Sequence, residues 1–271
     1  MNAEPLNHYA DNLADALALG SRDHVAMVGG GGKTSLMFSL AEELRQKGKR
    51  VITSTTTKIL LHEALRSPCI LYARDLNFQT DHLVEKLGNH GHLFVAQRVI
   101  ESGKVEGIGP TLADKLYRDS GVDYMLVEAD GSSGHPVKAH AEHEPVVPRS
   151  ATKVVAMMGL DAMGGALESA LVFRVDHFIR LTGLDRGRKL VSPILAKLFL
   201  KSGGLFKGAP PVSKRIAFLN KLDHLKDDGR ARELADLITQ HGETQIDRVI
   251  IGSVKKGVYC IQGQKDERYL S

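Results

Sequence analysis

Short apolar stretches alternate with amphipathic segments along most of the chain. Leucines at helical spacing predict a leading helix over residues 5–19. The apolar stretch His24–Val28 predicts a strand, and the leucine pattern over residues 36–44 predicts a helix that ends at Gly48. Arg50–Thr53 predicts the next strand. The chain therefore begins with a strand–turn–helix–strand unit.

The same alternation continues to the C-terminus. Ser102-Gly103, between two short apolar stretches, predicts a hairpin. Strands that alternate with helices predict a three-layer, P-loop NTPase-like α/β fold, in which a mainly parallel sheet carries helices on both faces. Since no repeat or linker divides the chain, we predict one domain over residues 1–271, with a helical subregion at residues 160–212. Further strands are predicted at residues 70–72, 93–96, 124–127, 153–158, 215–219, 249–251 and 258–261, and helices at residues 81–87, 111–118, 193–200 and 231–238.

Composition and charge narrow the classes of function. Hydrophobic residues make up 42% of the 271 positions and charged residues 25%, which is typical of a soluble globular protein. The net charge of +4 is not gathered into a basic run and tryptophan is absent, so nothing indicates a nucleic-acid partner. Glu4, Asp11 and Asp15 interrupt the N-terminal segment, which excludes a signal peptide, and no apolar stretch is long enough to cross a membrane. Cys69 and Cys260 are typical of core residues in a reducing compartment, so we expect a cytoplasmic protein.

Four consecutive glycines lie between the first predicted strand and the helix after it. Glycine permits turns in which several backbone N–H groups converge on one anion, and the N-terminus of the following helix adds its own N–H groups and dipole. A lysine at the start of that helix can reach the β- and γ-phosphates, and the hydroxyl beside it can hold Mg²⁺. The sequence therefore predicts a P-loop for GTP or ATP with Mg²⁺, formed by Gly29, Gly30, Gly31, Gly32, Lys33, Thr34 and Ser35.

This turn departs from two familiar patterns. Met27 stands where the usual P-loop has its first glycine, and Val28 stands where a variant P-loop has an additional lysine. A dinucleotide-binding Gly-x-Gly-x-x-Gly pattern that starts at Gly29 fails, because Thr34 takes the place of its third glycine. The alternative is a glycine turn that binds no ligand, but Lys33 in a strand–turn–helix context favours a triphosphate.

Polar side chains also follow two other predicted strands, at the ends where ligands of α/β sheets bind. Glu128 and Asp130 follow an apolar strand, and Glu128 takes the position from which an acid holds Mg²⁺ directly or through water. A threonine-rich run leads to Lys58, whose charge would stabilise phosphoryl transfer. The alternatives are a solvated strand end and a strand terminus rich in threonine. The predicted metal ligands are Thr34 and Glu128, and the predicted catalytic residues are Lys33, Lys58, Glu128 and Asp130.

An Asn-Lys-x-Asp pattern follows the predicted strand at residues 215–219. In guanine-nucleotide proteins the aspartate accepts hydrogen bonds from guanine N1 and N2, and the lysine lies along the base. Ser253-Val254-Lys255 follows a later strand, where a further guanine contact is often found. The pattern favours GTP over ATP, because buried donors and acceptors discriminate strongly between bases. The predicted base contacts are Asn220, Lys221 and Asp223.

The loop at residues 128–150 carries the densest polar cluster in the sequence. We predict that Lys138, His143 and Glu144 form a second site that faces another substrate or a client protein. Metal binding is an alternative, but the spacing fits no established metal motif, so a solvated loop is the simpler interpretation. The arginines and lysine at residues 180–189 form a basic patch, which is either a solvated face or a contact for an anionic substrate.

Six motifs together resemble those of the selenium-dependent molybdenum hydroxylase accessory protein family, a YqeC-like family linked to selenium cofactor biosynthesis. They are, in order, VGGGGKTS, TSTTTK, VEADGS, HEPVVP, GGLFKGAP and NKLD, and they extend from Val28 to Asp223. The resemblance implies a cytoplasmic P-loop NTPase that assists the maturation of selenium-containing molybdenum hydroxylases, with the hydroxylase or its cofactor as partner. It also implies that residues 29–35 bind phosphate.

Three functions are compatible with these observations. The first is a nucleotide-hydrolysing accessory protein, in which the γ-phosphate and Mg²⁺ order residues 55–58 and 128–134 until hydrolysis releases them. The second is a kinase or nucleotidyl-transfer enzyme that acts on a small anionic substrate. The third is a nucleotide-sensing module without turnover. Turnover without a second substrate would indicate the first function. Transfer of label to a small molecule would indicate the second, and tight binding without turnover would indicate the third.

Overall fold

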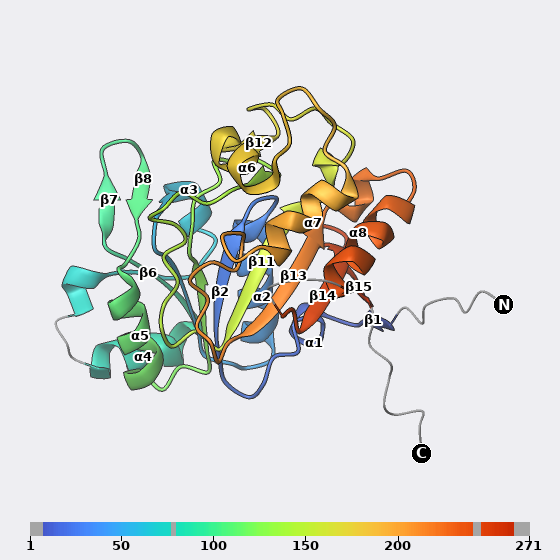
Figure 1. Cartoon of the computed structure of the whole chain (residues 1–271). Coiled ribbons are helices and arrows are strands. Elements are labelled where there is room, and N and C mark those ends of the chain that lie inside the picture. The colour runs from blue at the N-terminus through green and yellow to red at the C-terminus, as the bar shows by residue number, and fades with distance from the viewer. Residues whose placement is uncertain (1–7, 77–79, 241–244, 263–271) are drawn as a thin grey trace, which may run out of the picture.

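A ten-stranded sheet forms the centre of the protein in the computed structural model, which describes residues 8–76, 80–240 and 245–262 (Figure 1). Neighbouring strands run parallel, except where β14 meets β15 and β15 meets β1 at one edge. The predicted, mainly parallel sheet is therefore confirmed. In spatial order its strands are β1 (His8–Ala10), β15 (Val258–Gln262), β14 (Arg248–Ser253), β13 (Lys214–Asn220), β11 (Lys153–Gly159), β2 (Asp23–Gly29), β9 (Tyr124–Glu128), β3 (Val51–Thr55), β6 (His92–Ala96) and β5 (Ile70–Tyr72).

Helices cover both faces of this sheet, as the alternation of elements predicts. The buried strand β2 shows why: Val25 and Met27 pack in the core on the α1–α2 side, whereas Ala26 and Val28 pack in the core formed with α7 and α8. Each face of a strand thus meets its own helical layer, which confirms the three-layer α/β fold. The helices are α1 (Leu13–Ala16), α2 (Lys33–Gln46), α3 (Leu61–Ala64), α4 (Thr80–His90), α5 (Pro110–Asp119), α6 (Val175–Thr182), α7 (Ser192–Leu200) and α8 (Gly229–Gln240), with 3₁₀ turns η1 (Ala73–Leu76), η2 (Leu160–Ala162) and η3 (Leu222–His224).

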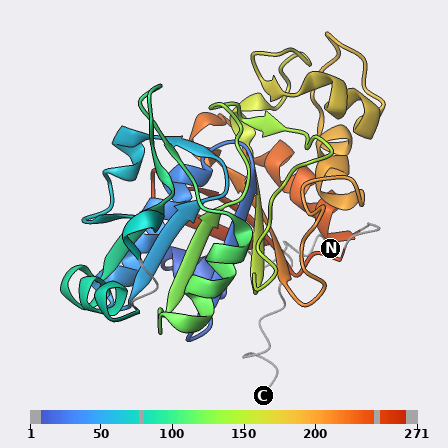
Figure 2. The same ribbon diagram turned by 90° about the vertical axis from the view of Figure 1, so that its left-hand side faces the viewer.

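Two small sheets accompany the main one. One is antiparallel and joins β4 (Lys58–Leu60), β8 (Lys104–Glu106) and β7 (Arg98–Ile100), and the other pairs β10 (Val137–Lys138) with β12 (Val172–Phe173). The β7–β8 pairing confirms the predicted hairpin. Figure 1 and Figure 2 both show this hairpin and α6 beyond the same end of the main sheet. The cavities described below also lie at that end, after the C-termini of β2, β3, β9 and β13.

The predicted helix over residues 5–19 is wrong in the part that the structure describes. Residues 8–10 form the edge strand β1, and the helix is limited to α1. Asn12 explains the late start, because its side chain accepts a hydrogen bond from the N–H group of Asp15 at 3.1 Å and caps the helix there. Ala18, with a φ of 48°, ends it. Residues 5–7 lie outside the described residues.

The segment over residues 160–212 combines helices with extended chain. It contains α6 and α7, as predicted, and also β12 and long connecting turns. Its apolar side chains, including Phe178 and Leu195, belong to the same buried cluster as Val154 of β11 and Leu219 of β13. In the described part of the chain, no helix is both long enough and apolar enough to cross a membrane.

Candidate functional site

The glycine turn after β2 has a backbone that only glycine accommodates. Gly31 has a φ of +76° and Gly32 a φ of +123°, in the region that other residues avoid. A Cβ atom on Gly31 would lie 2.2 Å from the backbone nitrogen of Gly159, and one on Gly32 would lie 2.6 Å from Nδ2 of Asn220. The turn therefore needs glycine both for its conformation and for its contact with the ends of β11 and β13.

The N-terminus of α2 is left open to a ligand. The first N–H groups of a helix have no acceptor within the helix, and no side chain caps α2 at Gly32. Gly30 and Gly31 donate their N–H groups to the carbonyl oxygens of Met157 and His135, both at 3.0 Å, and so shape the turn. The amides from Gly32 onward remain for an anion, and no acidic residue opposes one in the first helical turn.

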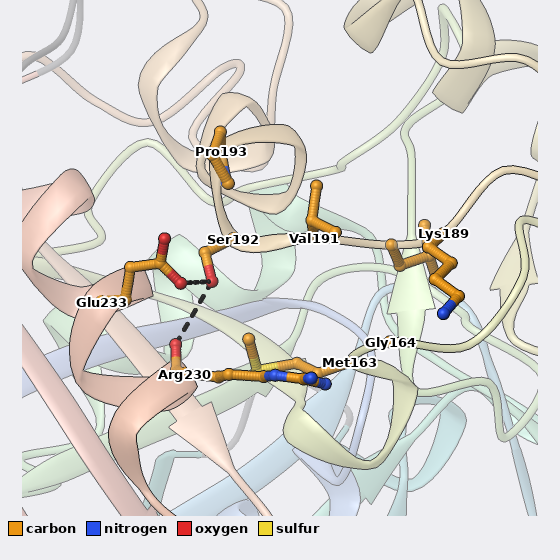
Figure 3. A pocket seen from close by; sticks show the side chains of 9 residues that line it. Met163, Gly164, Lys189, Val191, Ser192, Pro193, Arg230 and Glu233 are labelled. Carbon is orange, nitrogen blue, oxygen red and sulfur yellow. Dashed lines mark hydrogen bonds between the residues drawn. The ribbon is translucent and has the colours of Figure 1, made fainter.

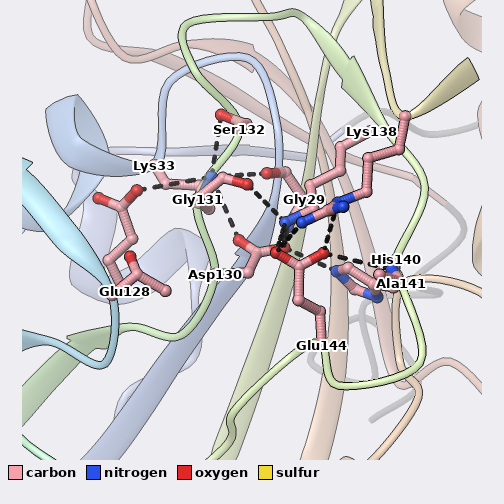
Figure 4. Close-up of polar contacts among 12 residues, drawn as sticks. Gly29, Lys33, Glu128, Asp130, Gly131, Ser132, Lys138, His140, Ala141 and Glu144 are labelled. Carbon is pink, nitrogen blue, oxygen red and sulfur yellow. Dashed lines mark hydrogen bonds and ion pairs between the residues drawn. The ribbon is translucent and has the colours of Figure 1, made fainter.

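Lys33 lies buried beneath this turn, between two carboxylates. Its Nζ atom lies 3.2 Å from Oδ1 of Asp130 and 3.6 Å from Oε1 of Glu128, and it also donates to the carbonyl of Gly29 and the hydroxyl of Ser132 (Figure 4). Burial alone would lower the pKa of Lys33, but the two carboxylates outweigh it and raise that pKa. Lys33 is therefore charged and held in place without a ligand.

Thr34 and Glu128 provide oxygens suited to a divalent cation. The Thr34 hydroxyl donates to Oε2 of Glu128 at 2.7 Å, at the point where α2 begins and β9 ends. Burial raises the pKa of Glu128, and it outweighs the opposing effects of Lys33 and the Thr34 hydrogen bond. A hydroxyl and a carboxylate beside a phosphate cradle fit Mg²⁺, which prefers a few oxygen ligands together with phosphate oxygens.

Asp130 is the centre of a buried network rather than an exposed group. Its Oδ2 atom accepts from the N–H group of Gly29 at 2.9 Å, lies 2.6 Å from Nε2 of His140, and lies 3.2 Å from Nζ of Lys138 (Figure 4). Burial would raise the pKa of Asp130, but Lys33, His140 and Lys138 together hold that pKa well below its usual range. Because its side chain is fully buried, Asp130 acts by positioning Lys33 and the glycine turn.

The structure brings two of the three residues of the predicted second site to this network. Lys138 is fully buried and lies 3.0 Å from Oε1 of Glu144, whose other oxygen lies 2.9 Å from Nε of Arg174. His143 is exposed and lies outside the network. His140, which the sequence does not distinguish from the other histidines of the loop, takes the buried position instead. The loop therefore connects to Lys33 through Asp130.

The Asn-Lys-x-Asp segment lies directly beside the glycine turn. Nδ2 of Asn220 donates to the carbonyl of Gly31 at 2.8 Å, and Oδ1 of Asn220 accepts from the N–H group of Val254 at 3.0 Å. Asp223 accepts from the Ser253 hydroxyl at 2.6 Å, and this hydrogen bond is the main cause that lowers the pKa of Asp223. The Asn220 side chain thus joins the glycine turn to the loop that contains Ser253, the hydrogen-bond partner of Asp223.

Two adjoining cavities follow from this arrangement. One, of about 420 Å³, is lined by side chains that include Asn220, Asp223 and Ser253. The other, of about 560 Å³, is lined by Lys33, Thr34, Glu128 and residues 131–134. The cavities share three lining residues, which are Gly32, Ser35 and Lys221. They therefore form one continuous cleft along the start of α2.

Several predicted side chains occupy this cleft in different ways. Lys58 lines the larger cavity together with the residues of the glycine turn. Lys221 lines both cavities, and its Nζ atom lies 2.7 Å from Oδ2 of Asp161. Within the described residues, no group of three or more histidine, cysteine, aspartate or glutamate side chains is arranged to hold a metal ion. Any metal here would rely on the ligand's own oxygens together with Thr34 and Glu128.

A third cavity lies apart from this cleft, between η2, α7 and α8 (Figure 3). It measures about 240 Å³ and shares no lining residue with the other two. Ser192 donates to the carboxylate of Glu233 at 2.8 Å and so joins the start of α7 to α8. Lys189 lines this cavity, whereas Arg186 of the same basic patch lies 2.7 Å from Asp176 on α6. We assign the cavity a structural role.

Comparison with known proteins gives one consistent result. The model of a family described as "YqeC protein" matches residues 25–176, which include the glycine turn, Glu128 and the loop through Glu144. A protein of Escherichia coli (strain K12), named "Uncharacterized protein YqeC", is 32% identical over 232 residues, which cover 86% of this chain and 88% of the relative. The family model therefore includes most of the residues that line the larger cavity.

Proposed function

This chain belongs to the YqeC protein family, and we propose that it binds GTP with Mg²⁺ in the cleft along α2 and hydrolyses it. One observation carries the proposal. The uncapped N-terminus of α2 holds Lys33 and Thr34 against Glu128 and Asp130, and the same cleft continues to Asp223. This arrangement supplies a place for the phosphates, for the cation and for the base.

The residues of the cleft have distinct tasks in this proposal. The amides of Gly32 to Ser35 bind phosphate oxygens, and Lys33 exchanges its contacts with Asp130 and Glu128 for contacts with the β- and γ-phosphates. Thr34 and Glu128 hold the cation. Bound Mg²⁺ neutralises the charge that develops on the phosphate oxygens during hydrolysis. Asp223, oriented by Ser253, accepts from the N–H groups of guanine.

The network around Asp130 supports a coupling between nucleotide and loop. When the γ-phosphate draws Lys33 away from Asp130, Lys138 and His140 become the main partners of that carboxylate. Lys138 also donates to the carbonyl of Gly131, which lines the phosphate cavity. A change at the phosphates is therefore passed to the loop that carries Glu144, by direct contacts between charged groups.

Two substitutions of Thr34 test the hydrolysis directly. Purified protein is expected to release phosphate from GTP only when Mg²⁺ is present. Thr34→Ala is expected to slow this release about tenfold, because a hydroxyl ligand to a charged group is worth about 1.5 kcal/mol. Thr34→Ser keeps the hydroxyl and should retain the rate. Equal rates for Thr34→Ala and the wild type would remove Thr34 as a cation ligand, and no release from any triphosphate would remove hydrolysis from the proposal.

We further propose that hydrolysis assists the maturation of selenium-dependent molybdenum hydroxylases. The motifs that resemble the accessory family contain the groups of the cleft, including Lys33, Glu128 and Asp223. Deleting the gene should lower the activity of such hydroxylases in the cell without changing the amount of their polypeptide. A wild-type copy should restore the activity and a Thr34→Ala copy should not. Unchanged hydroxylase activity after deletion would contradict the accessory role and leave the GTPase.

A further inference from the structure

One wall of the phosphate cavity comes from segments outside the glycine turn and the Asn-Lys-x-Asp segment. This wall is the small sheet of β4, β8 and β7, and it contributes Lys58, Leu60 and Lys104 to the lining of the same cavity as Lys33 and Thr34. Lys58 and Lys104 are far apart in the sequence, and the antiparallel pairing of β4 with β8 brings them together. The cavity is therefore lined by two lysines of this sheet in addition to Lys33 and Lys221.

The register of the small sheet explains why these side chains share one face. Lys58 lies opposite Glu106, and Leu60 lies opposite Lys104, so the four residues alternate with the pair Ile59 and Val105. Ile59 is 5% exposed and Val105 fully buried, which places that pair against the core. The face with the two lysines consequently turns away from the core, and Lys58, Leu60 and Lys104 line the cavity together with Ile59.

The two lysines lack the partners that the other cations of the cavity have. Lys33 is paired with Glu128 and Asp130, and Lys221 with Asp161. The carboxylate opposite Lys58 belongs to Glu106, but Arg98 of β7 takes it at 2.6 Å. Among the described residues, neither Lys58 nor Lys104 makes an ion pair or a side-chain hydrogen bond. Glu63 of α3 also lines the cavity without bonding to either of them.

From this geometry we propose that the Lys58–Lys104 wall binds the oxyanion group of a second, small-molecule substrate next to the bound nucleotide. The inference rests on the proposed function, because the nucleotide would fill the opposite side of the cleft. Two uncompensated ammonium groups suit a phosphate or a carboxylate. Leu60, which is 41% exposed, offers contact to an apolar part of the same molecule. Ser132 and Ser133 in the lining add hydroxyl groups on the side of the glycine turn.

The proposed wall differs from the second site that the sequence predicts at Lys138, His143 and Glu144. Lys138 and Glu144 are buried in ion pairs with each other and with neighbouring groups, so they are not available to a small molecule. Lys58 and Lys104 face open volume instead. The loop at residues 138–144 then responds to the nucleotide, while the small sheet provides the contact to the substrate.

Equilibrium dialysis of radiolabelled inorganic phosphate tests whether the Lys58–Lys104 wall binds an oxyanion. The protein is first loaded with Mg²⁺ and a β,γ-imido analogue of GTP, which occupies the γ-phosphate position and is not hydrolysed. Phosphate should then bind the loaded wild type. Lys104→Gln should weaken phosphate binding about tenfold more than it weakens analogue binding, the effect of losing one charged hydrogen bond. Lys104→Arg keeps the charge and should retain phosphate. Lys189→Gln, which removes a lysine from the separate cavity in Figure 3, should change neither.

The outcomes separate this inference from the proposed function. Failure of the analogue to bind the wild type would overturn both together. Analogue binding without phosphate binding overturns the second-substrate wall alone. So does a Lys104→Gln variant that weakens analogue and phosphate equally, because the lysine would then contact the nucleotide. Lys58→Gln should behave as Lys104→Gln does toward phosphate, and undiminished phosphate binding by both variants would also contradict the inference.

Discussion

Replacing Lys33 with alanine is expected to abolish measurable GTP binding and to lower the free energy of unfolding by about 3–5 kcal/mol. Binding is lost because Lys33 is the buried cation at the centre of the phosphate cradle. Stability is lost because Glu128 and Asp130 would stay buried without their shared partner. The burial of both ion pairs is the reason why the substitution lowers stability as well as binding.

Two measurements check this prediction separately. Calorimetric titration with GTP and Mg²⁺, at a temperature where circular dichroism shows the variant to be folded, reports binding. Urea denaturation reports stability. Lys47→Ala is the matched control, because it removes an exposed lysine paired with Glu43 at the other end of α2 and should alter neither quantity greatly. Wild-type affinity for GTP in folded Lys33→Ala protein would refute the phosphate cradle.

Changing Asp223 to asparagine is expected to lower the affinity for GTP about 100-fold and to leave the affinity for ATP unchanged. The carboxylate accepts two hydrogen bonds from guanine, and asparagine can accept only one of them while it presents an unwanted donor. Xanthine carries an oxygen where guanine carries its amino group. The variant should therefore bind xanthosine triphosphate more tightly than the wild type does.

Competition against a fluorescent GTP analogue measures all three affinities in one assay. Asp119→Asn, at an exposed position at the end of α5, is the matched control for the loss of one carboxylate. An unchanged ratio of GTP to ATP affinity in Asp223→Asn would show that this aspartate does not read the base. The cleft would then be assigned to nucleoside triphosphates in general.

Local sequence predicted the parts of the site that lie within one turn or one strand end. Glycines between an apolar strand and a helix indicate the turn between β2 and α2, and Glu128 is the last residue of β9, so the two features lie side by side at one end of the sheet. The network around Asp130 could not be predicted, because Lys138 lies in the two-residue strand β10 and His140 in the irregular chain after it, so no periodicity indicates where their side chains point. Nothing local distinguishes buried His140 from exposed His143.

Long-range pairing limited the prediction in another way. β4 has only three residues, too few for a period of two to be recognised, and Lys104 reaches the cavity only through the pairing of β4 with β8. The helix predicted over residues 5–19 is wrong for a similar reason. Residues 8–10 extend the sheet by pairing with β15 near the other end of the chain, and that tertiary contact overrides the helical spacing of the leucines.

The central claim is that one cleft binds GTP together with Mg²⁺, and calorimetric titration of the wild-type protein tests this claim most directly. We expect GTP to bind with a stoichiometry near one when Mg²⁺ is present, and ATP to bind about 100-fold more weakly. Omitting Mg²⁺ should weaken GTP binding, since Thr34 and Glu128 then lack the ion that links them to the phosphates. Absence of GTP binding with Mg²⁺ present would contradict the account.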